Sequence, residues 1–435
     1  MAKIRLAIIG SGWSGFTLSQ KVNLALYDIT VISPVRTIQY TPLLASAACG
    51  LFDFRLGEEP IKRKTRHGLK YYNAYAEHID LEKRTIKCKP ALPASLAMSK
   101  GDGVFNVEYD KICVAPGCSI QTFGTEGAEE HSMFLRTTND ARLIQQKILE
   151  ILDTASLPTM TPEQQKDVLN IRVVGGGAIG IEAAAEIHDL WAEEMRFLYP
   201  HLDGKVTITI HDVADSLLST FDSALSEYAH ESFDRKNIKI ATGSHIERVE
   251  ADAIFTKEDG RLPFGMLIWA TGNKVNPMVE SLECKKPEKG MPRILTDSKL
   301  HILRPDGSPI ESAFALGDAA DIDGTSLPML AEVALQKGEY LSDVLNKSDI
   351  IGVQVPKFEY KDKATIAYLG SHDGIVGGEQ KWTGKNAWLA WRSGKKDVDA
   401  LWKYKVEDYK KDSAVEEFVK AAPKRCGFMI RAGRN

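Results

Sequence analysis

The stretch IRLAIIGSGWSGFTLSQK at residues 4–21 decides the fold, because an apolar strand pattern runs through a glycine turn into a helix pattern. Its glycines, Gly10, Gly12 and Gly15, have the spacing G-x-G-x-x-G. In such a turn the first glycine allows the bend, the second lets the backbone approach a pyrophosphate, and the third lets helix and strand pack closely. The N–H groups at the helix start favour that anion. The stretch therefore predicts a dinucleotide-binding unit.

The same arrangement recurs in NIRVVGGGAIG at residues 170–180, where Gly175, Gly177 and Gly180 follow an apolar run and open a helix pattern. A single match would be weak, since glycine-rich turns are common. Two matches, each between a strand pattern and a helix pattern, predict that one chain binds two dinucleotides. The pairing indicates electron transfer between a nicotinamide and a flavin.

The composition is that of a multidomain globular protein. The chain has 435 residues, of which 43% are hydrophobic and 26% are charged, so two or three domains are expected. A net charge of −4 gives no reason to expect a nucleic-acid partner. Six cysteines, none at C-x-x-C spacing, favour a reducing compartment and predict neither a metal site nor a disulfide scaffold.

The apolar runs and the start of the chain bear on its location. The first strand pattern begins at Ile4, so we expect no leader peptide, with a processed start left open. No apolar run reaches the ~18–20 residues that span a bilayer. The chain as given is therefore expected to be cytoplasmic.

We predict an α/β fold with two Rossmann-like dinucleotide-binding domains and a small C-terminal α+β module. Prolines near residue 160 indicate a boundary at about 165, and the composition changes after Pro356. The expected division is an FAD-binding domain at 1–165 and 291–350, an NADH-binding domain at 166–290, and the C-terminal module at 351–435.

The periodicity of apolar residues predicts the main elements. Helices are expected at about 14–25, 138–155, 178–197 and 328–346, strands at 27–32, 206–210 and 313–315, strands ending in glycine turns at 111–117 and 267–272, and an irregular segment at 34–59. Apolar residues in the tail at 398–409 have helical spacing, and the charges between them are of both signs. This favours packing on the body or on a second subunit over a membrane-surface helix.

Residues at strand ends are the candidate nucleotide ligands. Asp212 follows the second strand of the second unit, where a carboxylate accepts from both ribose hydroxyls and repels a 2′-phosphate, so NADH is favoured over NADPH. The alternative is a solvated loop aspartate. Ser33 holds this position in the first unit and does not by itself decide the nucleotide. Gly317 and Asp318 follow a strand pattern and precede a helix pattern, so Asp318 is expected to accept from a flavin ribityl hydroxyl or to cap that helix.

The cysteines do not favour a dithiol reductase, which needs two thiols beside its flavin. The segment at 41–49, after the second strand of the first unit, carries Cys49 alone. Cys113 and Cys118 flank a strand end and a turn, where buried or bystander thiols are favoured over a redox pair.

Together these residues resemble the type II, non-proton-pumping NADH:quinone oxidoreductases, especially the fungal and plant mitochondrial branch. The similar segments are the flavin turn at 10–15, the SPR…FTPLL segment at 33–44, the NADH turn at 175–182, the flavin GD motif at 316–319, and the C-terminal motifs at 358–370 and 387–393. The resemblance covers nearly the whole chain, with several motifs in the same order.

The resemblance implies that the chain binds FAD and NADH, and that electrons pass from NADH through the flavin to a quinone. It implies that Glu182 lies near the nicotinamide–flavin junction, and that Glu332 and Gln336 stand in the quinone motif. The cofactor-binding residues are expected to be Gly10, Gly12, Trp13, Ser14, Gly15, Ser33, Pro34, Thr41, Pro42, Gly117, Gly175, Gly177, Gly180, Asp212, Gly272, Gly317 and Asp318.

Three departures from the family concern the acceptor and the membrane. The quinone motif of the family reads A-Q-x-A-x-Q, and here Glu332 replaces the first glutamine while Gln336 remains. An amide donates to a quinone carbonyl, whereas an ionised carboxylate does not. Ala364 and Thr365 replace the usual Gly-Ser, and charged sequence follows Ser393 in place of an apolar anchor.

Three functions stay open from the sequence. The leading one is an FAD-dependent NADH dehydrogenase with a quinone or quinone-like acceptor. The second is a soluble relative that oxidises or reduces a small metabolite in a biosynthetic pathway, as Glu332 and the charged tail favour. The third is an NADH-responsive flavoprotein with a role in assembly. Membrane contact is expected to be peripheral at most, with mitochondrial association as one option, and the family habit suggests a homodimer through the C-terminal module.

Overall fold

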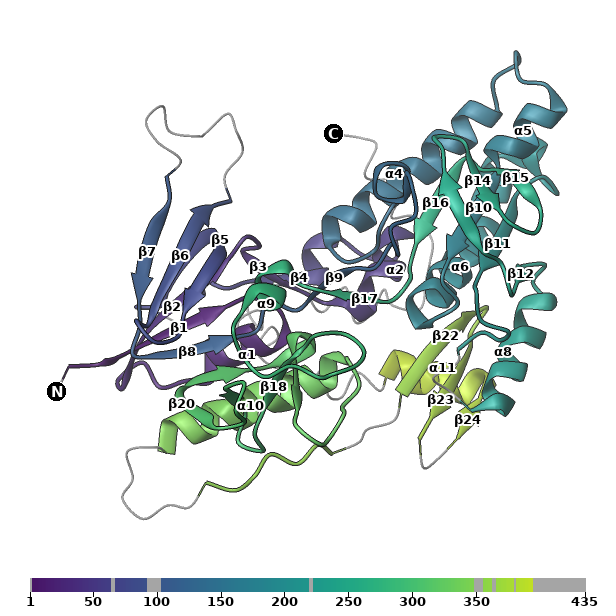
Figure 1. Cartoon of the computed structure of the whole chain (residues 1–435). Coiled ribbons are helices and arrows are strands. Elements are labelled where there is room, and N and C mark those ends of the chain that lie inside the picture. Colours follow the sequence, from purple (N-terminus) through teal and green to yellow (C-terminus); the bar gives the residue numbers. More distant parts are fainter. Residues whose placement is uncertain are drawn as a thin grey trace, which may run out of the picture. The chain divides into compact units, whose positions relative to one another are not determined.

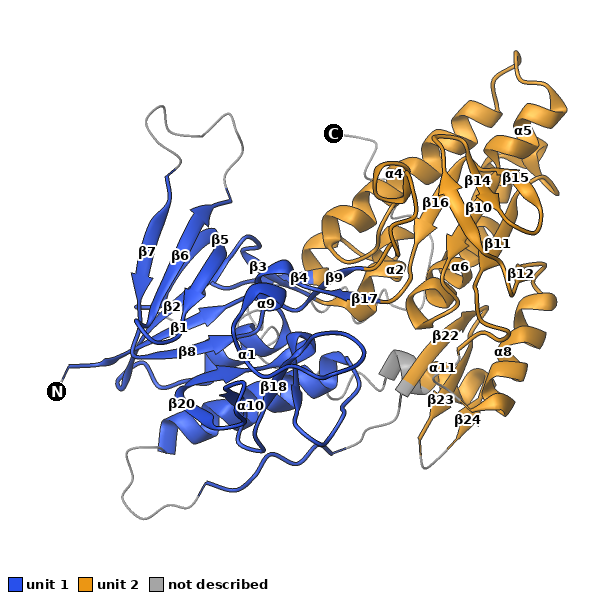
Figure 2. Cartoon of the chain, viewed as in Figure 1, with its two compact units in different colours: residues 1–39, 58–120, 273–361 blue, residues 40–57, 121–272, 362–435 orange. Residues whose placement is uncertain are grey.

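The computed structural model describes residues 2–63, 67–91, 103–218, 222–347, 355–361, 365–378 and 381–393 (Figure 1). The chain forms two compact units, and each unit is made of three chain segments (Figure 2). Unit 1 comprises residues 1–39, 58–120 and 273–361, and unit 2 comprises residues 40–57, 121–272 and 362–435. This division reflects packing, and the FAD, NADH and C-terminal domain limits expected from the sequence stay a prediction.

Unit 1 is built on a ten-stranded sheet with a parallel centre. The parallel strands, in spatial order, are β5 (Lys70–Asp80), β2 (Tyr27–Ser33), β1 (Ile4–Ile9), β8 (Lys111–Val114) and β20 (Pro309–Ala315). By position in the chain this is the order 3-2-1-4-5 of a doubly wound sheet. Such a sheet places the carboxyl ends of its parallel strands at one edge, where the first glycine turn begins.

Short strands complete the edges of this sheet and form two small pairs in unit 1. The edge strands are β6 (Thr85–Pro90) and β7 (Phe105–Glu108) on one side, and β19 (His301–Leu303), β18 (Ile294–Thr296) and β21 (Ala320–Ile322) on the other. The pairs are β3 (Thr37–Gln39) with β4 (Glu58–Pro60), and β9 (Cys118–Ile120) with β17 (Asn273–Val275).

The helices α1 (Trp13–Lys21) and α10 (Ala331–Lys347) pack on each other in unit 1, which also contains α9 (Pro277–Ser281). A Cβ on Gly338 of α10 would lie 3.0 Å from the carbonyl oxygen of Ser14, so these helices approach at close range. Both are shorter than expected. The backbone of Val22 is extended and ends α1, and a turn from Pro328 to Leu330 precedes α10.

Unit 2 contains a second parallel sheet with the same beginning of the strand order, 3-2-1-4. Its strands, in spatial order, are β12 (Lys239–Ala241), β11 (Thr207–His211), β10 (Asn170–Val174) and β16 (Met266–Trp269). Two antiparallel sheets accompany it: β13 (Ile246–Val249), β14 (Ala253–Thr256) and β15 (Gly260–Pro263), and β22 (Thr365–Gly370), β23 (Asp373–Gly377) and β24 (Trp382–Thr383).

The helices of unit 2 are α2 (Leu44–Ala48), α3 (Ala128–His131), α4 (Thr138–Ala155), α5 (Pro162–Val168), α6 (Ala178–Leu190), α7 (Arg196–Leu198), α8 (Ser223–Asp234) and α11 (Gly384–Ser393). The bounds of α4 agree with the sequence prediction, because Thr137 and Asp140 form a capping box at its start. A π turn at Trp191–Met195 joins α6 to α7, so the helix expected near 178–197 is interrupted rather than uniform.

The segment expected to be irregular, 34–59, contains short elements instead. They are β3, a 3₁₀ turn at Thr41–Leu43, α2, a 3₁₀ turn at Phe54–Gly57, and the start of β4. The tail at 398–409 lies outside the described residues. Within the described part of the chain, no helix combines the length and the apolar character needed to cross a membrane.

Candidate functional site

The first glycine turn joins β1 to α1 in unit 1. Gly10 has a φ of +96°, and a Cβ there would lie 2.1 Å from the carbonyl oxygen of Ala115. A Cβ on Gly15 would lie 2.2 Å from the carbonyl oxygen of Gly10. A Cβ on Gly12, by contrast, would meet no described atom within 4 Å, and its φ of −70° suits any residue. Packing within the protein therefore explains the outer two glycines, and the open space beside Gly12 fits a ligand that approaches the backbone.

The hydroxyls around this turn hold it in place. Ser14 Oγ donates to the carbonyl oxygen of Ala334 at 2.8 Å, which ties α1 to α10. Ser33 Oγ lies 2.9 Å from Ser11 Oγ and accepts from the N–H of Val35 at 3.2 Å. Ser33 is thus buried at the end of β2 and contacts the turn itself.

The other residues expected around the flavin are spread over both units. Trp13 is half-buried at the start of α1, and Pro34 is exposed just beyond β2. Gly117 follows β8, and a Cβ there would meet no described atom within 4 Å. Thr41 and Pro42 are exposed in a 3₁₀ turn that belongs to unit 2. The sequence therefore grouped residues that packing divides between two units.

The Gly317–Asp318 motif lies in a 3₁₀ turn, Gly317–Ala319, and β21 follows it directly. The expectation that a helix comes next was wrong, since α10 starts only at Ala331, and Asp318 therefore does not cap it. A Cβ on Gly317 would lie 3.1 Å from Ser14 Oγ. The motif is thus beside the start of α1, in the same unit as the first glycine turn.

The second glycine turn joins β10 to α6 in unit 2 and repeats the first. Gly175 has a φ of +111°, and a Cβ there would lie 2.6 Å from the carbonyl oxygen of Ala270. A Cβ on Gly180 would lie 2.0 Å from the carbonyl oxygen of Gly175. A Cβ on Gly177 would again meet no described atom within 4 Å. The two turns share one steric pattern, in which only the middle glycine lacks a described protein neighbour that requires it.

Asp212 follows β11 directly, and its carboxylate lies beside the second turn. Its Oδ1 accepts from the N–H of Ala214 at 2.8 Å, and its Oδ2 accepts from the N–H of Gly176. These bonds orient the carboxylate, so it differs from a freely solvated loop aspartate. Gly272 follows β16 in the same unit, and a Cβ there would meet no described atom within 4 Å.

Behind Asp212 lies a buried polar pair that the sequence analysis missed. Arg172 donates to His211 Nε2 at 2.9 Å, and His211 Nδ1 lies 3.0 Å from Ser244 Oγ. Burial, with the charge of Arg172, lowers the pKa of His211 to about 4, so the ring is neutral and its proton is on Nδ1. The N–H of Ser244 donates to the carbonyl oxygen of Asp212 at 2.9 Å. The available signal was a polar side chain, Arg172 in one strand pattern and His211 at the end of the next.

Glu182 lies in α6, and its Oε1 accepts from the N–H of Tyr368 in β22 at 3.2 Å. The carboxylate is half-buried and contacts the C-terminal strands of its own unit. A place near the nicotinamide stays a prediction, and the described geometry also assigns Glu182 a structural role.

Glu332 and Gln336 are one helical turn apart on α10, and their side chains are hydrogen-bonded. Gln336 Nε2 donates to Glu332 Oε1 at 2.7 Å and to the carbonyl oxygen of Lys361 at 3.0 Å. Gln336 Oε1 accepts from the N–H of Lys361 at 3.0 Å. The amide expected at the quinone thus binds the backbone of Lys361 and the carboxylate of Glu332.

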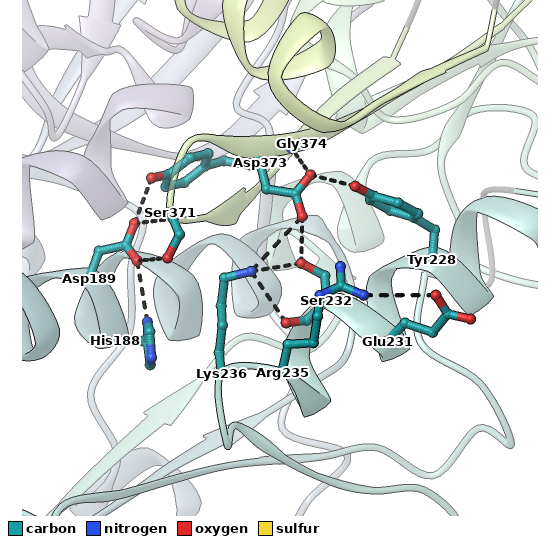
Figure 3. A network of polar contacts seen from close by, with 11 residues as sticks. His188, Asp189, Tyr228, Glu231, Ser232, Arg235, Lys236, Ser371, Asp373 and Gly374 are labelled. Carbon is teal, nitrogen blue, oxygen red and sulfur yellow. Dashed lines mark hydrogen bonds and ion pairs between the residues drawn. The ribbon is translucent and has the colours of Figure 1, made fainter.

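A second polar network, in unit 2, joins the C-terminal strands to α6 and α8 (Figure 3). Asp373 accepts from the hydroxyls of Tyr228 at 2.9 Å and Ser232 at 2.6 Å, and it lies 3.9 Å from Lys236 Nζ. Asp189 accepts from the N–H of Ser371 at 2.8 Å and from a tyrosine hydroxyl of β22 at 2.5 Å. The network therefore attaches the hairpin β22–β23 to two helices of its own unit.

The described thiols show no paired arrangement. The five described cysteines are in the thiol form, and burial raises the pKa of Cys113. The thiol of Cys118 donates to the carbonyl oxygen of Asp318 at 3.5 Å. Among the described residues, no group of three or more His, Cys, Asp or Glu could hold a metal ion.

Comparison with known proteins identifies relatives along most of the chain. The model of the pyridine nucleotide-disulphide oxidoreductase family matches residues 4–338. A probable NADH dehydrogenase of Dictyostelium discoideum is 33% identical over 86% of this chain and 80% of its own length. The internal alternative NAD(P)H-ubiquinone oxidoreductase A1 of Solanum tuberosum, a mitochondrial protein, is 30% identical over 93% of this chain and 84% of its own length. The external enzyme B4 of Arabidopsis thaliana is 35% identical, but the chain spans 55% of its length.

Solved structures confirm the predicted fold class. NDH2 of Plasmodium falciparum in complex with NADH superposes with a TM-score of 0.81 at 23% identity, covering 91% of this chain and 95% of that one. The sulfide:quinone oxidoreductase of Aquifex aeolicus gives a TM-score of 0.68 at 19% identity, covering 92% of this chain and 91% of that one. At these identities the likeness is one of fold.

Proposed function

The chain belongs to the pyridine nucleotide-disulphide oxidoreductase family, among relatives named NADH dehydrogenases, and from this premise we propose that it passes electrons from NADH through FAD to a quinone. The family expected from the sequence is therefore confirmed. The residues of the sites and the identity of the acceptor are part of the proposal.

One observation carries the proposal: each of the two glycine turns has open space beside its middle glycine. Nothing in the described packing requires glycine at Gly12 or Gly177, whereas a pyrophosphate close to the backbone does. The start of α1 and the start of α6 each offer N–H groups to such an anion. The residues present thus fit two dinucleotides, one in each unit.

We assign FAD to the turn in unit 1 and NADH to the turn in unit 2. Ser33, Gly317 and Asp318 accompany the first turn in unit 1, and Asp212 accompanies the second. When bound, FAD would supply the centre that accepts hydride from NADH and passes electrons on to the acceptor. Asp212 presents a carboxylate to ribose hydroxyls and repels a 2′-phosphate, which supports NADH as the donor.

A quinone is the acceptor that the names of the plant relatives favour. A small soluble acceptor is the second candidate, because the amide of Gln336 binds Glu332 and the backbone of Lys361. Peripheral association with mitochondria belongs to the quinone proposal. We also propose that the chain forms a homodimer. Light scattering of the oxidised and the NADH-reduced protein would measure its mass in each state.

The test is anaerobic stopped-flow reduction of the purified flavoprotein by NADH, followed by mixing with a short-chain ubiquinone. We expect rapid loss of the flavin absorbance and rapid reoxidation. Glu332→Gln should speed reoxidation by ubiquinone about tenfold, the effect of about one added hydrogen bond, because an amide at 332 donates to a carbonyl where a carboxylate repels. Reduction by NADH should change less than about twofold.

Glu339→Gln is the matched control, since Glu339 stands on the same helix and pairs with Lys21 at 2.6 Å. It should leave both rates unchanged. If NADH reduces the flavin but ubiquinone does not reoxidise it, in the wild type and in Glu332→Gln alike, the result favours a small soluble molecule as the acceptor. A folded protein without flavin contradicts the whole proposal.

A further inference from the structure

A lysine is fully buried in unit 1, directly behind the Gly317–Ala319 turn. Lys337 stands on the inner face of α10 between Val333 and Leu341, and its relative exposure is 0%. Its Nζ lies 3.4 Å from the carbonyl oxygen of Ala320. Lysines are almost never buried completely without a specific partner, so its surroundings need an explanation.

Arg293, just before β18, supplies a second cation to the same place. Its Nε donates to the carbonyl oxygen of Asp318 at 3.0 Å, and one terminal nitrogen donates to that of Ala320 at 2.6 Å. Its other terminal nitrogen lies 2.8 Å from the carboxylate of Asp321. Arg293 therefore holds the turn from behind through two backbone carbonyls.

The buried part of this cluster holds more cations than carboxylates. Two cations, Lys337 and Arg293, face the buried carboxylate of Asp321, which also accepts from Ser326 Oγ at 3.1 Å. Burial and Arg293 lower the pKa of Lys337 to about 8, against the opposing pull of Asp321 and Asp318, so the amine stays mainly protonated at pH 7. The buried groups behind the turn are therefore two cations and one carboxylate, and the second acidic residue, Asp318, is half-buried.

The peptide between Asp318 and Ala319 directs an N–H group away from the two cations. The carbonyl of Asp318 accepts from Arg293, and in a trans peptide the N–H of Ala319 points the opposite way. That N–H is directed away from the cations, and the turn also borders Ser14 at the start of α1. The side of the turn away from Arg293 thus presents a peptide N–H backed by fixed positive charge.

We propose that Lys337 and Arg293 form a buried positive centre that raises the reduction potential of the flavin bound at the Gly317–Ala319 turn. The inference rests on the proposed FAD site. Two-electron reduction adds negative charge to the flavin ring system, and a fixed cation in a water-excluded interior stabilises such charge more than it would in water. Lys337 is thus a positioning residue that acts on the electron carrier without contacting the substrate.

The experiment measures the flavin midpoint potential by anaerobic equilibration with a reference dye. Lys337→Met removes the charge and keeps the length of the side chain, and Lys337→Gln removes the charge and keeps a donor for the Ala320 carbonyl. Both variants should lower the midpoint potential of the flavin by at least about 30 mV. For a two-electron couple this is a tenfold shift of the equilibrium toward oxidised flavin. Lys337→Arg keeps the positive charge and should have the wild-type midpoint potential. Lys347→Met, on the exposed end of the same helix, should also leave the potential unchanged.

Each outcome decides the matter. The inference is overturned if the uncharged variants bind FAD and their equilibrium between oxidised and reduced flavin stays within about twofold of the wild type. Uncharged variants that fold, by circular dichroism, but lose FAD assign the charge to binding and also overturn it. Wild-type protein that binds no FAD overturns the proposed function instead, so the two failures are distinguishable.

Discussion

At the scale of single residues, His211 shows what the neighbours of a strand residue determine. A histidine inside a strand pattern carries no sign of its partner, yet the structure pairs it with Arg172 on the adjacent strand β10. Asp212, one residue later, was expected from the sequence because the end of the second strand is where a ribose ligand lies. The position of a residue along a strand is therefore predictable, whereas its partner across the sheet is not.

We expect His211 to make the protein less stable in mild acid. The pKa of His211 is about 4 in the folded protein, against an ordinary 6.5, so between these values the unfolded chain binds a proton that the folded chain excludes. Stability is complete above about pH 6.5 and falls as the pH drops toward 4. The loss should be about 2 kcal/mol between pH 7 and pH 5.

His211→Gln keeps an acceptor for Arg172 and removes this titration. The free energy of unfolding in urea, compared between pH 7 and pH 5, should fall about 2 kcal/mol less in His211→Gln than in the wild type. His67→Gln, at an exposed position of unit 1, should behave as the wild type does. Equal acid sensitivity in the wild type and His211→Gln would show that another group carries the effect.

At the scale of elements, the glycine turns were predictable from the sequence, whereas packing in the structure supplied the reason for the first and the last glycine of each turn. The sequence indicated where strand, turn and helix follow one another, because glycine spacing and apolar period are local features. It placed a helix after Asp318, however, where a 3₁₀ turn and β21 follow. A short buried strand such as Ala320–Ile322 has too few residues to show a period of its own.

The last and the middle glycine of the second turn should respond differently to alanine. Gly180→Ala places a Cβ 2.0 Å from the carbonyl oxygen of Gly175 and should lower Tm by about 5 °C or more. Gly177→Ala meets no described atom within 4 Å at a φ of −78°, so Tm should stay within about 2 °C.

Binding separates the two variants further. Gly177→Ala should weaken NADH at least tenfold, about 1.4 kcal/mol, in a fluorescence titration, because the methyl group occupies the space of the pyrophosphate. Thermal unfolding followed by circular dichroism measures the Tm of both variants. If Gly177→Ala binds NADH as the wild type does, the second turn is not the NADH site.

At the scale of the whole molecule, the chain crosses between its units several times, and contacts distant in sequence decide which segment belongs to which unit. The hairpin β22–β23 lies in unit 2, where Asp189 and Asp373 join it to α6 and α8 (Figure 3). Gln336 binds Lys361 at the end of the last segment of unit 1. Such attachments have no local signature.

Removal of Asp373 should loosen the hairpin without disturbing unit 1. Asp373→Ala withdraws the acceptor of Tyr228 and Ser232 and removes the carboxylate that lies 3.9 Å from the amine of Lys236, a loss of about 3 kcal/mol. Hydrogen exchange of the amides in β22 and β23 should accelerate at least tenfold. The flavin spectrum should not change, since the proposed FAD residues of the first turn lie in unit 1.

Glu231→Ala is the control, because Glu231 stands on the same helix α8 and pairs only loosely with Arg235, at 3.8 Å. It should leave the exchange of the hairpin as in the wild type. Unchanged exchange in Asp373→Ala would mean that apolar packing, rather than this network, holds the hairpin.

The sequence by itself determined the fold class, the family and the two glycine turns. These rest on features that repeat over a few residues: apolar period, glycine spacing and the residue after a strand. The cofactor residues named from those features stay predictions, with the open space beside Gly12 and Gly177 in their favour.

Only the tertiary structure decided which groups meet in the interior. It placed Arg172 against His211, Gln336 against Lys361, and Lys337 behind the Gly317–Ala319 turn. A buried polar or charged group must find its partner wherever the fold brings one, and the partner can stand anywhere in the chain. Local sequence pattern therefore specifies the elements, while the electrostatics of the site depend on long-range packing.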